Sequence, residues 1–277
     1  MIKVNDNIVE IGSFPDETIL MKHGRDETYS ASIEWHYEND REIVALIYLT
    51  KHLRRLGYHV IDLLMPYIPN ARQDRVKNPE DIFTLKYFSE IINDLHFNTV
   101  IVLDPHSTVS EALINNIMVI SPKDYINKVI SKLNIKTSEL YNPIECVYKK
   151  NYSLTMFYPD AGAMSRYSGM ISLPYAFGIK KRNWETGQIE GLDVAGAVDQ
   201  IRGRDILIVD DICSRGGTFY HSAKKLKELG AKDIYLYVSH CENTILEGEL
   251  LKGDLIQKIY TTDSIFTKSH EKIEVLR

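Results

Sequence analysis

The stretch LIVDDICSRGGTF, residues 207–219, determines which fold this chain is expected to adopt. Its apolar start is typical of a buried strand, which runs into two adjacent acids, Asp210 and Asp211, and then into a loop of small residues. Gly216 and Gly217 permit backbone conformations in which consecutive N–H groups converge on an anion, and a helix after them adds its positive N-terminal end. The stretch therefore predicts a strand, a phosphate-binding loop and a helix, in that order.

The acidic pair in this stretch has two interpretations. Asp210 and Asp211 suit either vicinal sugar hydroxyls or a metal-bound sugar, and Thr218 can add a hydroxyl. The plain alternative is a strand-to-helix turn with two solvated acids, which is the usual meaning of a bare DD followed by GG. The apolar strand in front of the pair makes the full string much more specific, so we expect a sugar-phosphate site.

Helical and extended patterns alternate through the rest of the chain. Helical spacing occurs in segments 41–57, 80–95 and 221–230, and the strand candidates are 58–65, 99–104, 153–160, 174–180, 204–211 and 233–240. This alternation predicts an α/β fold with parallel sheets, and it is compatible with two similar halves, although no short repeat is visible. The boundary is expected in the polar stretch 135–152, which gives domains 1–142 and 143–277.

The composition excludes several classes of protein. With 277 residues, 44% of them hydrophobic and 26% charged, the chain can form a packed core, which argues against global disorder. The net charge of −5 gives no basic field for nucleic acid, and no apolar run approaches the roughly 20 residues that span a bilayer. Three scattered cysteines and a start without a signal-peptide pattern favour a soluble, cytoplasmic protein without nucleic-acid or membrane partners.

Chemically active side chains gather at the ends of the expected strands. In open parallel sheets the ligand lies beyond the carboxyl ends of the strands, so residues at these ends are candidates for a site. They are Asp104, His106, Asp160, Lys180, Asp210 and Asp211.

The string at 207–219 resembles the ribose-phosphate-binding signature of the type I phosphoribosyltransferase superfamily. Further segments, in the same order along the chain, are similar to those of one branch, the ribose-phosphate pyrophosphokinases (PRPP synthetases). They are PYIPNARQDR (66–75), VLDPHS (102–107), YPDAGAMSR (158–166), IKKRN (179–183), VSHCENTILEGEL (238–250) and IYTTDSI (259–265). The resemblance implies two phosphoribosyltransferase-like domains, each a mostly parallel sheet flanked by helices, in a homo-oligomer.

The resemblance assigns two segments to ATP. Arg72 and Gln73 supply a planar cation and an amide, which suit stacking on adenine and contact with its polar edge or the phosphates. The alternative is a solvated loop in which the arginines pair with Asp74. The segment FPDET is similar to the family's other ATP-contacting segment and adds Asp16 and Glu17, with Glu17 where the family usually has Gly.

His106 and Asp160 are the candidate ligands of a divalent cation. An imidazole and a carboxylate oxygen can hold Mg²⁺, which otherwise keeps waters and the phosphate oxygens of a substrate. A lone His is more often structural, but its place in DPH, together with the PDAG segment, reverses those odds. By resemblance both residues bind Mg²⁺, and Asp104 positions His106.

Lys180 and Arg182 begin a polar, Gly-containing stretch, KKRNWETGQIEG, which can form a mobile lid between two strands; the alternative is a solvated basic loop. By resemblance Lys180 is catalytic and Arg182 bridges the two substrates. The implied reaction is diphosphoryl transfer, in which the anomeric hydroxyl of ribose 5-phosphate attacks the β-phosphorus of Mg·ATP. The products are AMP and 5-phosphoribosyl 1-diphosphate.

Two acceptors are consistent with the sugar-phosphate loop. By resemblance the loop consists of Asp210, Asp211, Ser214, Arg215, Gly216, Gly217 and Thr218. A short neutral loop accommodates ribose 5-phosphate, whereas the added cation of Arg215 suits a second phosphate, as in ADP-ribose, the acceptor of phage-type relatives that rebuild NAD. The alternatives for Arg215 are a side chain that points to solvent or one that pairs with Asp211.

Two other functions compete with this one. A phosphoribosyltransferase that consumes PRPP would need the loop but no ATP segment, and the sequence ARQDR argues against it. A non-catalytic regulator would be expected to lack the catalytic lysine, and Lys180 is present.

Overall fold

The computed structural model describes residues 1–24, 29–133, 136–142, 147–182 and 189–277. The chain forms two compact units, unit 1 from Met1 to Ser121 and unit 2 from Pro122 to Arg277. The division therefore precedes the boundary expected at 142/143. The physical reason is helix α4 (Lys123–Lys132), which buries Ile126 and Val129 in the core of unit 2.

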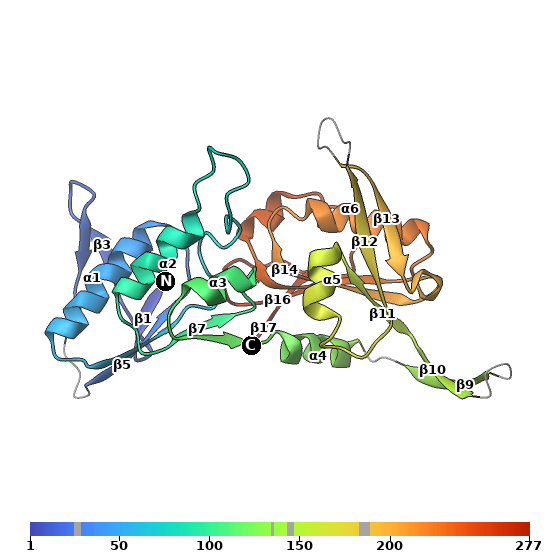
Figure 1. The fold of residues 1–277 in the computed structure, drawn as a ribbon, viewed down its shortest axis with the longest axis horizontal. Coiled ribbons are helices and arrows are strands. Elements are labelled where there is room, and N and C mark those ends of the chain that lie inside the picture. The colour runs from blue at the N-terminus through green and yellow to red at the C-terminus, as the bar shows by residue number, and fades with distance from the viewer. Residues whose placement is uncertain (25–28, 134–135, 143–146, 183–188) are drawn as a thin grey trace. The chain divides into compact units, whose positions relative to one another are not determined.

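Unit 1 contains a six-stranded sheet in the order β2-β1-β5-β6-β7-β8 (Figure 1). Strands β5 to β8 are parallel, while β1 pairs antiparallel with both of its neighbours. The strands are β1 (Ile2–Val4), β2 (Asn7–Ile8), β5 (Ser30–Trp35), β6 (Val60–Leu64), β7 (Val100–Leu103) and β8 (Ile117–Ile120). The helices are α1 (Arg41–Arg55), α2 (Thr84–Asp94) and α3 (Thr108–Leu113), and β3 (Ile11–Ser13) and β4 (Ile19–Met21) form a separate hairpin.

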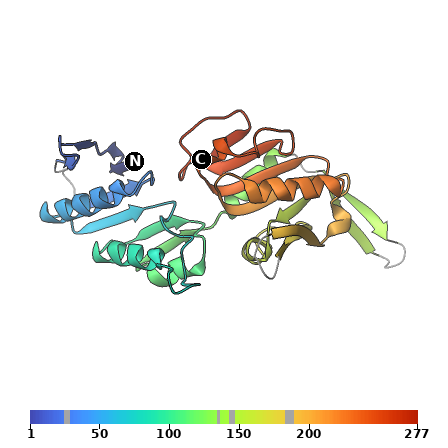
Figure 2. The same ribbon diagram turned by 90° about the horizontal axis from the view of Figure 1, so that it is seen from above.

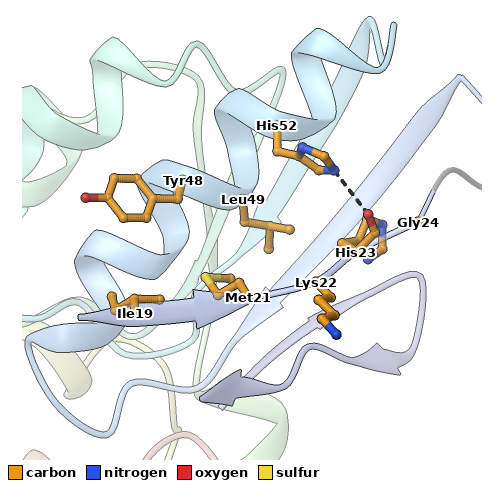
Figure 3. A pocket seen from close by; sticks show the side chains of 8 residues that line it. All are labelled: Ile19, Met21, Lys22, His23, Gly24, Tyr48, Leu49 and His52. Carbon is orange, nitrogen blue, oxygen red and sulfur yellow. Dashed lines mark hydrogen bonds between the residues drawn. The ribbon is translucent and has the colours of Figure 1, made fainter. Parts of the chain in front are cut away.

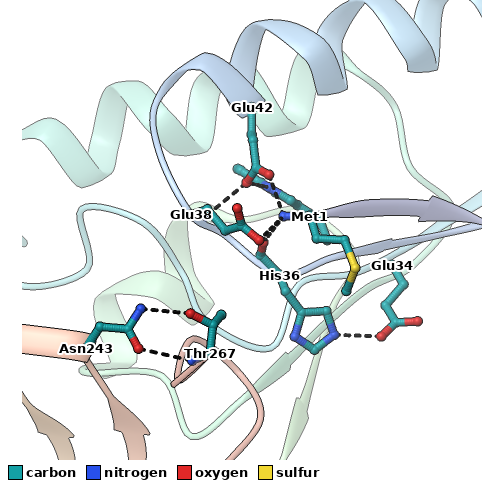
Figure 4. A network of polar contacts seen from close by, with 8 residues as sticks. Met1, Glu34, His36, Glu38, Glu42, Asn243 and Thr267 are labelled. Atoms are coloured by element: carbon teal, nitrogen blue, oxygen red, sulfur yellow. Dashed lines mark hydrogen bonds and ion pairs between the residues drawn. The ribbon is translucent and has the colours of Figure 1, made fainter. Parts of the chain in front are cut away.

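A buried carboxylate fixes the start of α1 to the strands. Glu42, in the first turn of α1, accepts hydrogen bonds from the Trp35 indole at 3.0 Å and from the Glu38 backbone N–H at 2.9 Å (Figure 4). It also pairs with the amino group of Met1. Because a buried charge is tolerated only when it is paired and hydrogen-bonded, this network holds the helix at a defined position on the sheet.

Unit 2 contains a seven-stranded sheet in the order β13-β12-β11-β14-β15-β16-β17. All neighbours are parallel except β12 and β13, so the expectation of a mostly parallel sheet flanked by helices is confirmed. The strands are β11 (Leu154–Tyr158), β12 (Tyr175–Arg182), β13 (Ile189–Gly196), β14 (Asp205–Cys213), β15 (Ile234–Cys241), β16 (Lys258–Thr262) and β17 (Ile273–Leu276). The helices of unit 2 are α4, α5 (Ala161–Tyr167) and α6 (Gly217–Glu228), with two 3₁₀ turns, η1 (Val198–Gln200) and η2 (Asn243–Glu247). Strands β9 (Thr137–Asn142) and β10 (Val147–Tyr152) form a separate hairpin.

The central strand β14 is buried on both faces, as its unbroken apolar run predicts. Ile206 and Ile208 pack into one core with α6, whereas Leu207 and Val209 pack into a second core with α4 and α5. Figures 1 and 2 show α6 and α4 on opposite faces of the sheet. Strands covered on both faces are the rule in parallel sheets, because the connecting helices lie on either side.

No helix in the described parts of the chain is both long enough and apolar enough to span a bilayer.

Candidate active site

The carboxyl end of β14 brings two acids together in unit 2. Asp211 is 4% exposed, and its backbone N–H donates to Oδ1 of Asp210 at 3.0 Å. Burial raises the pKa of Asp210 well above its usual value, and the neighbouring charges of Asp211 and Asp160 raise it further. Carboxylates crowded in this way are stabilised by hydroxyl donors or by a cation, which is the chemistry that the sequence predicts here.

Asp160 and Arg166 reach the same edge from α5. Asp160 lies at the N-cap of α5 and accepts a hydrogen bond from the Ala163 N–H at 3.1 Å. In the last turn of α5, Nη1 of Arg166 lies 3.2 Å from Oδ2 of Asp211, with its side chain 25% exposed. The sequence analysis did not single out Arg166. The available signal was an arginine six residues after the acidic N-cap residue of a short helix, about 1.7 turns along it.

The predicted phosphate loop is held in shape by its glycines. Gly216 has a φ of 77°, the left-handed region that favours glycine, and it forms the N-cap of the twelve-residue helix α6. Gly217 has open space around its Cα, and Thr218 is exposed. The first backbone N–H groups of α6 therefore lie beside an accessible surface, as an anion site requires.

Arg215 forms an ion pair that the sequence did not predict. Its Nη2 lies 3.2 Å from Oε2 of Glu247, and both side chains are largely exposed. The expectation that Arg215 could pair with Asp211 is not met, because the arginine beside Asp211 is Arg166. Ser214, next to Arg215, is half-buried.

The predicted catalytic residues close β12. This strand lies beside β11 in parallel, so its carboxyl end lies at the same sheet edge as Asp160. It ends at Arg182, whose backbone pairs with Ile189 of β13. The side chains of Lys180 and Arg182, and the whole of 183–188, lie outside the described residues.

In unit 1, the segment ARQDR is organised by one ion pair. Asp74 is 5% exposed and accepts two hydrogen bonds from Arg75, at 2.8 and 3.0 Å, and this contact lowers the pKa of Asp74. Pairing within the loop, the plain alternative, is thus found for these two residues. Gln73 accepts a hydrogen bond from the Thr84 hydroxyl at 2.9 Å, and Arg72 is exposed.

The DPH segment lies next to ARQDR. The N–H of Leu103 donates to the Pro66 carbonyl at 3.0 Å, which joins the end of β7 to the start of PYIPNARQDR. Asp104 is buried with a φ of 40°, and the half-buried His106 lies close enough to Asp74 to lower the pKa of that carboxyl further. His106 belongs to unit 1 and Asp160 to unit 2. Within the described ranges, no three His, Cys, Asp or Glu side chains form a metal-binding group.

The segment FPDET forms the turn between β3 and β4. Asp16 accepts hydrogen bonds from the Thr18 hydroxyl at 2.7 Å and backbone N–H at 3.1 Å, which lowers the pKa of Asp16. Glu17 has a φ of 67°, so the turn keeps a backbone conformation that glycine adopts most easily. Both side chains are exposed at the tip of the hairpin.

Unit 1 also has a cavity of about 650 Å³. It opens between β4, the residues that follow it and α1, and its lining includes Met21, His23, Tyr48 and His52 (Figure 3). Nε2 of His52 lies 3.1 Å from the backbone carbonyl of His23. None of the predicted site residues lines this cavity.

Comparison with known proteins finds relatives that match most of the chain. The chain is 23% identical over 252 residues to the ribose-phosphate pyrophosphokinase of Saccharolobus solfataricus, covering 87% of this chain and 77% of that protein. It is 27% identical over 235 residues to that of Thermococcus kodakarensis (84% and 77% covered) and 26% identical over 243 residues to that of Staphylococcus aureus (85% and 70% covered). No family model matches the chain.

A solved structure shows the same fold. The phosphoribosylpyrophosphate synthetase of Mycobacterium smegmatis superposes with a TM-score of 0.74, over 97% of this chain and 85% of that one. The sequence identity of that pair is 15%, so the similarity describes the arrangement of the elements.

Proposed function

The chain belongs to the ribose-phosphate pyrophosphokinase family, and from this premise we propose that it transfers the diphosphoryl group of ATP to the anomeric hydroxyl of ribose 5-phosphate. The products are AMP and 5-phosphoribosyl 1-diphosphate. The observation that carries the proposal is the end of β14, where two crowded acids, a left-handed glycine and the start of α6 follow one another within a few residues.

The acceptor's 5-phosphate binds, in this proposal, at the N-terminus of α6. The N–H groups of the first helical turn donate to it, and Thr218 adds its hydroxyl. Asp210 and Asp211 lie one loop away and accept hydrogen bonds from the ribose hydroxyls. Since burial, and after it the neighbouring carboxylates, raise the pKa of Asp210, hydroxyl donors arriving at this site stabilise its ionised form.

The donor groups also fit a divalent cation. Asp160 and Asp210 offer carboxylate oxygens close to one another in unit 2, whereas His106, the other ligand that the family resemblance implies, belongs to unit 1. Oxygen ligands of this kind, completed by waters and substrate phosphates, are those that Mg²⁺ prefers. When bound, Mg²⁺ would neutralise the negative charge of the triphosphate.

The remaining predicted site residues have distinct parts in the reaction. Arg72 and Gln73 hold ATP, with Asp16 and Glu17 of the β3–β4 turn as further contacts. Lys180 stabilises the negative charge that develops on the transferring group. Arg182 orients the two substrates so that the anomeric oxygen lies in line with the β-phosphorus.

Arg215 favours a second candidate acceptor. It places an exposed guanidinium directly before the left-handed glycine of the loop, where a neutral residue would suffice for one phosphate. A sugar phosphate whose O5 carries a diphosphate, such as ADP-ribose, presents an additional anion for a cation at this position. The chemistry of transfer would be the same.

The test is the formation of AMP from Mg·ATP with ribose 5-phosphate or ADP-ribose as acceptor, followed by ³¹P NMR to identify a diphosphate attached at the anomeric carbon. AMP that depends on ribose 5-phosphate supports the first candidate, and AMP that depends on ADP-ribose supports the second. ATP left intact with both acceptors would refute the proposed function.

A further inference from the structure

The cation of the phosphate loop is already paired with a carboxylate from another part of unit 2. Nη2 of Arg215 lies 3.2 Å from Oε2 of Glu247, and the two side chains are 73% and 61% exposed. Ion pairs with this exposure are weak, so a ligand anion can compete for the guanidinium. The pair is therefore exchangeable, whereas the backbone around it is fixed.

Two glycines fix that backbone. A Cβ on Gly248 would lie 1.9 Å from the Arg215 carbonyl oxygen, and a Cβ on Gly216 would lie 2.9 Å from Cδ2 of Leu250. The loop and the residues around Gly248 can approach so closely only because both positions are glycine. The neighbouring position, Glu247, is consequently held beside Arg215 by the fold itself.

The turn that carries Glu247 is anchored at its other end as well. The N–H of Glu242 donates to the Cys213 carbonyl at 2.8 Å, which ties the end of β15 to the end of β14. Asn243, at the start of η2, exchanges two hydrogen bonds with Thr267, at 2.9 and 3.1 Å (Figure 4). Glu247 thus lies on a turn whose backbone is held at both ends, which keeps its carboxylate within reach of Arg215.

We infer that Glu247 determines acceptor specificity by competing with the acceptor for Arg215. A single phosphate held by the N–H groups of α6 needs no contact with the guanidinium. A diphosphate on O5 brings a further anion, which must take Arg215 from Glu247 and lie near the carboxylate that it displaces. Glu247 therefore disfavours acceptors with a diphosphate at O5 relative to those with one phosphate. The inference rests on the proposed use of this loop as the acceptor site.

The test compares Glu247→Gln with Glu249→Gln. Glu249 is a matched control, because it is an exposed glutamate two residues away whose partner is Lys252 at 2.6 Å. In the full-length protein with Mg·ATP, Glu247→Gln should shift the ratio of kcat/KM values by about threefold to fivefold toward ADP-ribose and away from ribose 5-phosphate. The shift should lie in KM, and Glu249→Gln should leave the ratio unchanged.

A second pair of variants establishes that Arg215 mediates the effect. In an Arg215→Gln background, Glu247→Gln should no longer change the ratio, because there is no cation to release. A shift that persists in this background would overturn the inference. So would a shift toward ribose 5-phosphate in the single variant, since Glu247 would then be orienting Arg215 onto the ligand.

Binding of inorganic diphosphate, measured by calorimetry without ATP, separates this inference from the proposed function. Diphosphate should bind about threefold to fivefold more tightly to Glu247→Gln than to the wild type and to Glu249→Gln. If neither acceptor yields AMP but this difference is found, the proposed function fails and the competition for Arg215 stands. Equal or weaker binding to Glu247→Gln overturns the inference.

Discussion

Asp74, in a loop of unit 1, and Asp210, within β14 of unit 2, both lie in segments predicted to bind substrates, yet their surroundings shift their pKa values in opposite directions. Asp74 accepts two hydrogen bonds from Arg75, which lower its pKa. Asp210 is desolvated beside Asp211 and Asp160, which raise its pKa. The first carboxylate is stabilised by a cation in its own loop, whereas the second is buried among like charges. A carboxylate that the fold leaves unfavourably placed is the stronger indicator of function.

The largest expected effect tests whether the edge of unit 2 carries the chemistry. Lys180→Ala should raise the activation free energy by about 3 kcal/mol and so lower kcat, because the charge of Lys180 is needed mainly in the transition state. Binding of ATP, measured by calorimetry, should change little. Lys181→Ala is the neighbouring control and should keep most of the activity. An unchanged kcat with a raised KM would make Lys180 a binding residue.

Asp210→Asn should lower the activity of the protein and raise its thermal stability. The variant loses an ionised carboxylate that accepts hydrogen bonds from the ribose hydroxyls. The fall in kcat/KM for the sugar phosphate should therefore correspond to about 1.5–3 kcal/mol. The same change removes repulsion among carboxylates, so the thermal midpoint at pH 7 should rise. Asp199→Asn, at an exposed position of η1, is the control and should alter neither quantity. A lower midpoint for Asp210→Asn would contradict the contrast with Asp74.

Asp74→Asn should act in the opposite direction on stability. It breaks a two-bond contact with Arg75 at a site where Asp74 is 5% exposed, so unfolding in urea should show a loss of about 1–2 kcal/mol. The KM for ATP should rise, because the contact shapes the loop that carries Arg72. Asp81→Asn is a useful comparison, since the hydrogen bonds that Asp81 accepts at 2.9 and 2.8 Å come from the backbone N–H groups of Lys77 and Asn78 instead of a guanidinium. A stability equal to that of the wild type would show that the Asp74 contact is dispensable.

The smallest effect is the pH dependence of these stability differences. The folded pKa of Asp74 is lowered, so its contribution is present above the unfolded value, about 3.9, and is lost as pH falls through the folded pKa. The folded pKa of Asp210 is raised, so its penalty is full above that pKa and disappears as pH falls toward about 3.9. Urea unfolding from pH 7 to pH 4 should therefore show the advantage of Asp210→Asn shrinking while the deficit of Asp74→Asn persists. Parallel behaviour of the two variants would contradict the opposite pKa shifts.

Features set by a few adjacent residues could be predicted from the sequence. The apolar run before Asp210 and the glycines after it define β14, the loop and α6, and each appears where expected. The domain boundary could not be placed as well, because α4 looks like part of the first half until its packing against the second core is known. The sequence of a ten-residue helix does not indicate which of two sheets it will pack against.

Contacts between residues far apart in the chain could not be predicted from the sequence. Arg215 and Glu247 are 32 positions apart, and nothing in either segment marks the other as its partner. The pairing of Arg166 with Asp211 likewise depends on how α5 turns at its N-cap. Long polar side chains have many partners within reach, so only the packed backbone decides between them.

The interlocked glycines at 216 and 248 have a practical meaning for protein engineering. They keep the main chain of the loop constant while the neighbouring side chains, at 215 and 247, project from it into solvent. Random libraries at 215 and 247 alone should consequently sample many charge patterns on an unaltered scaffold, whereas changes at 216 or 248 would require a new loop. Specificity for the substituent on O5 of the sugar acceptor could thus be redesigned by changing residues 215 and 247 alone.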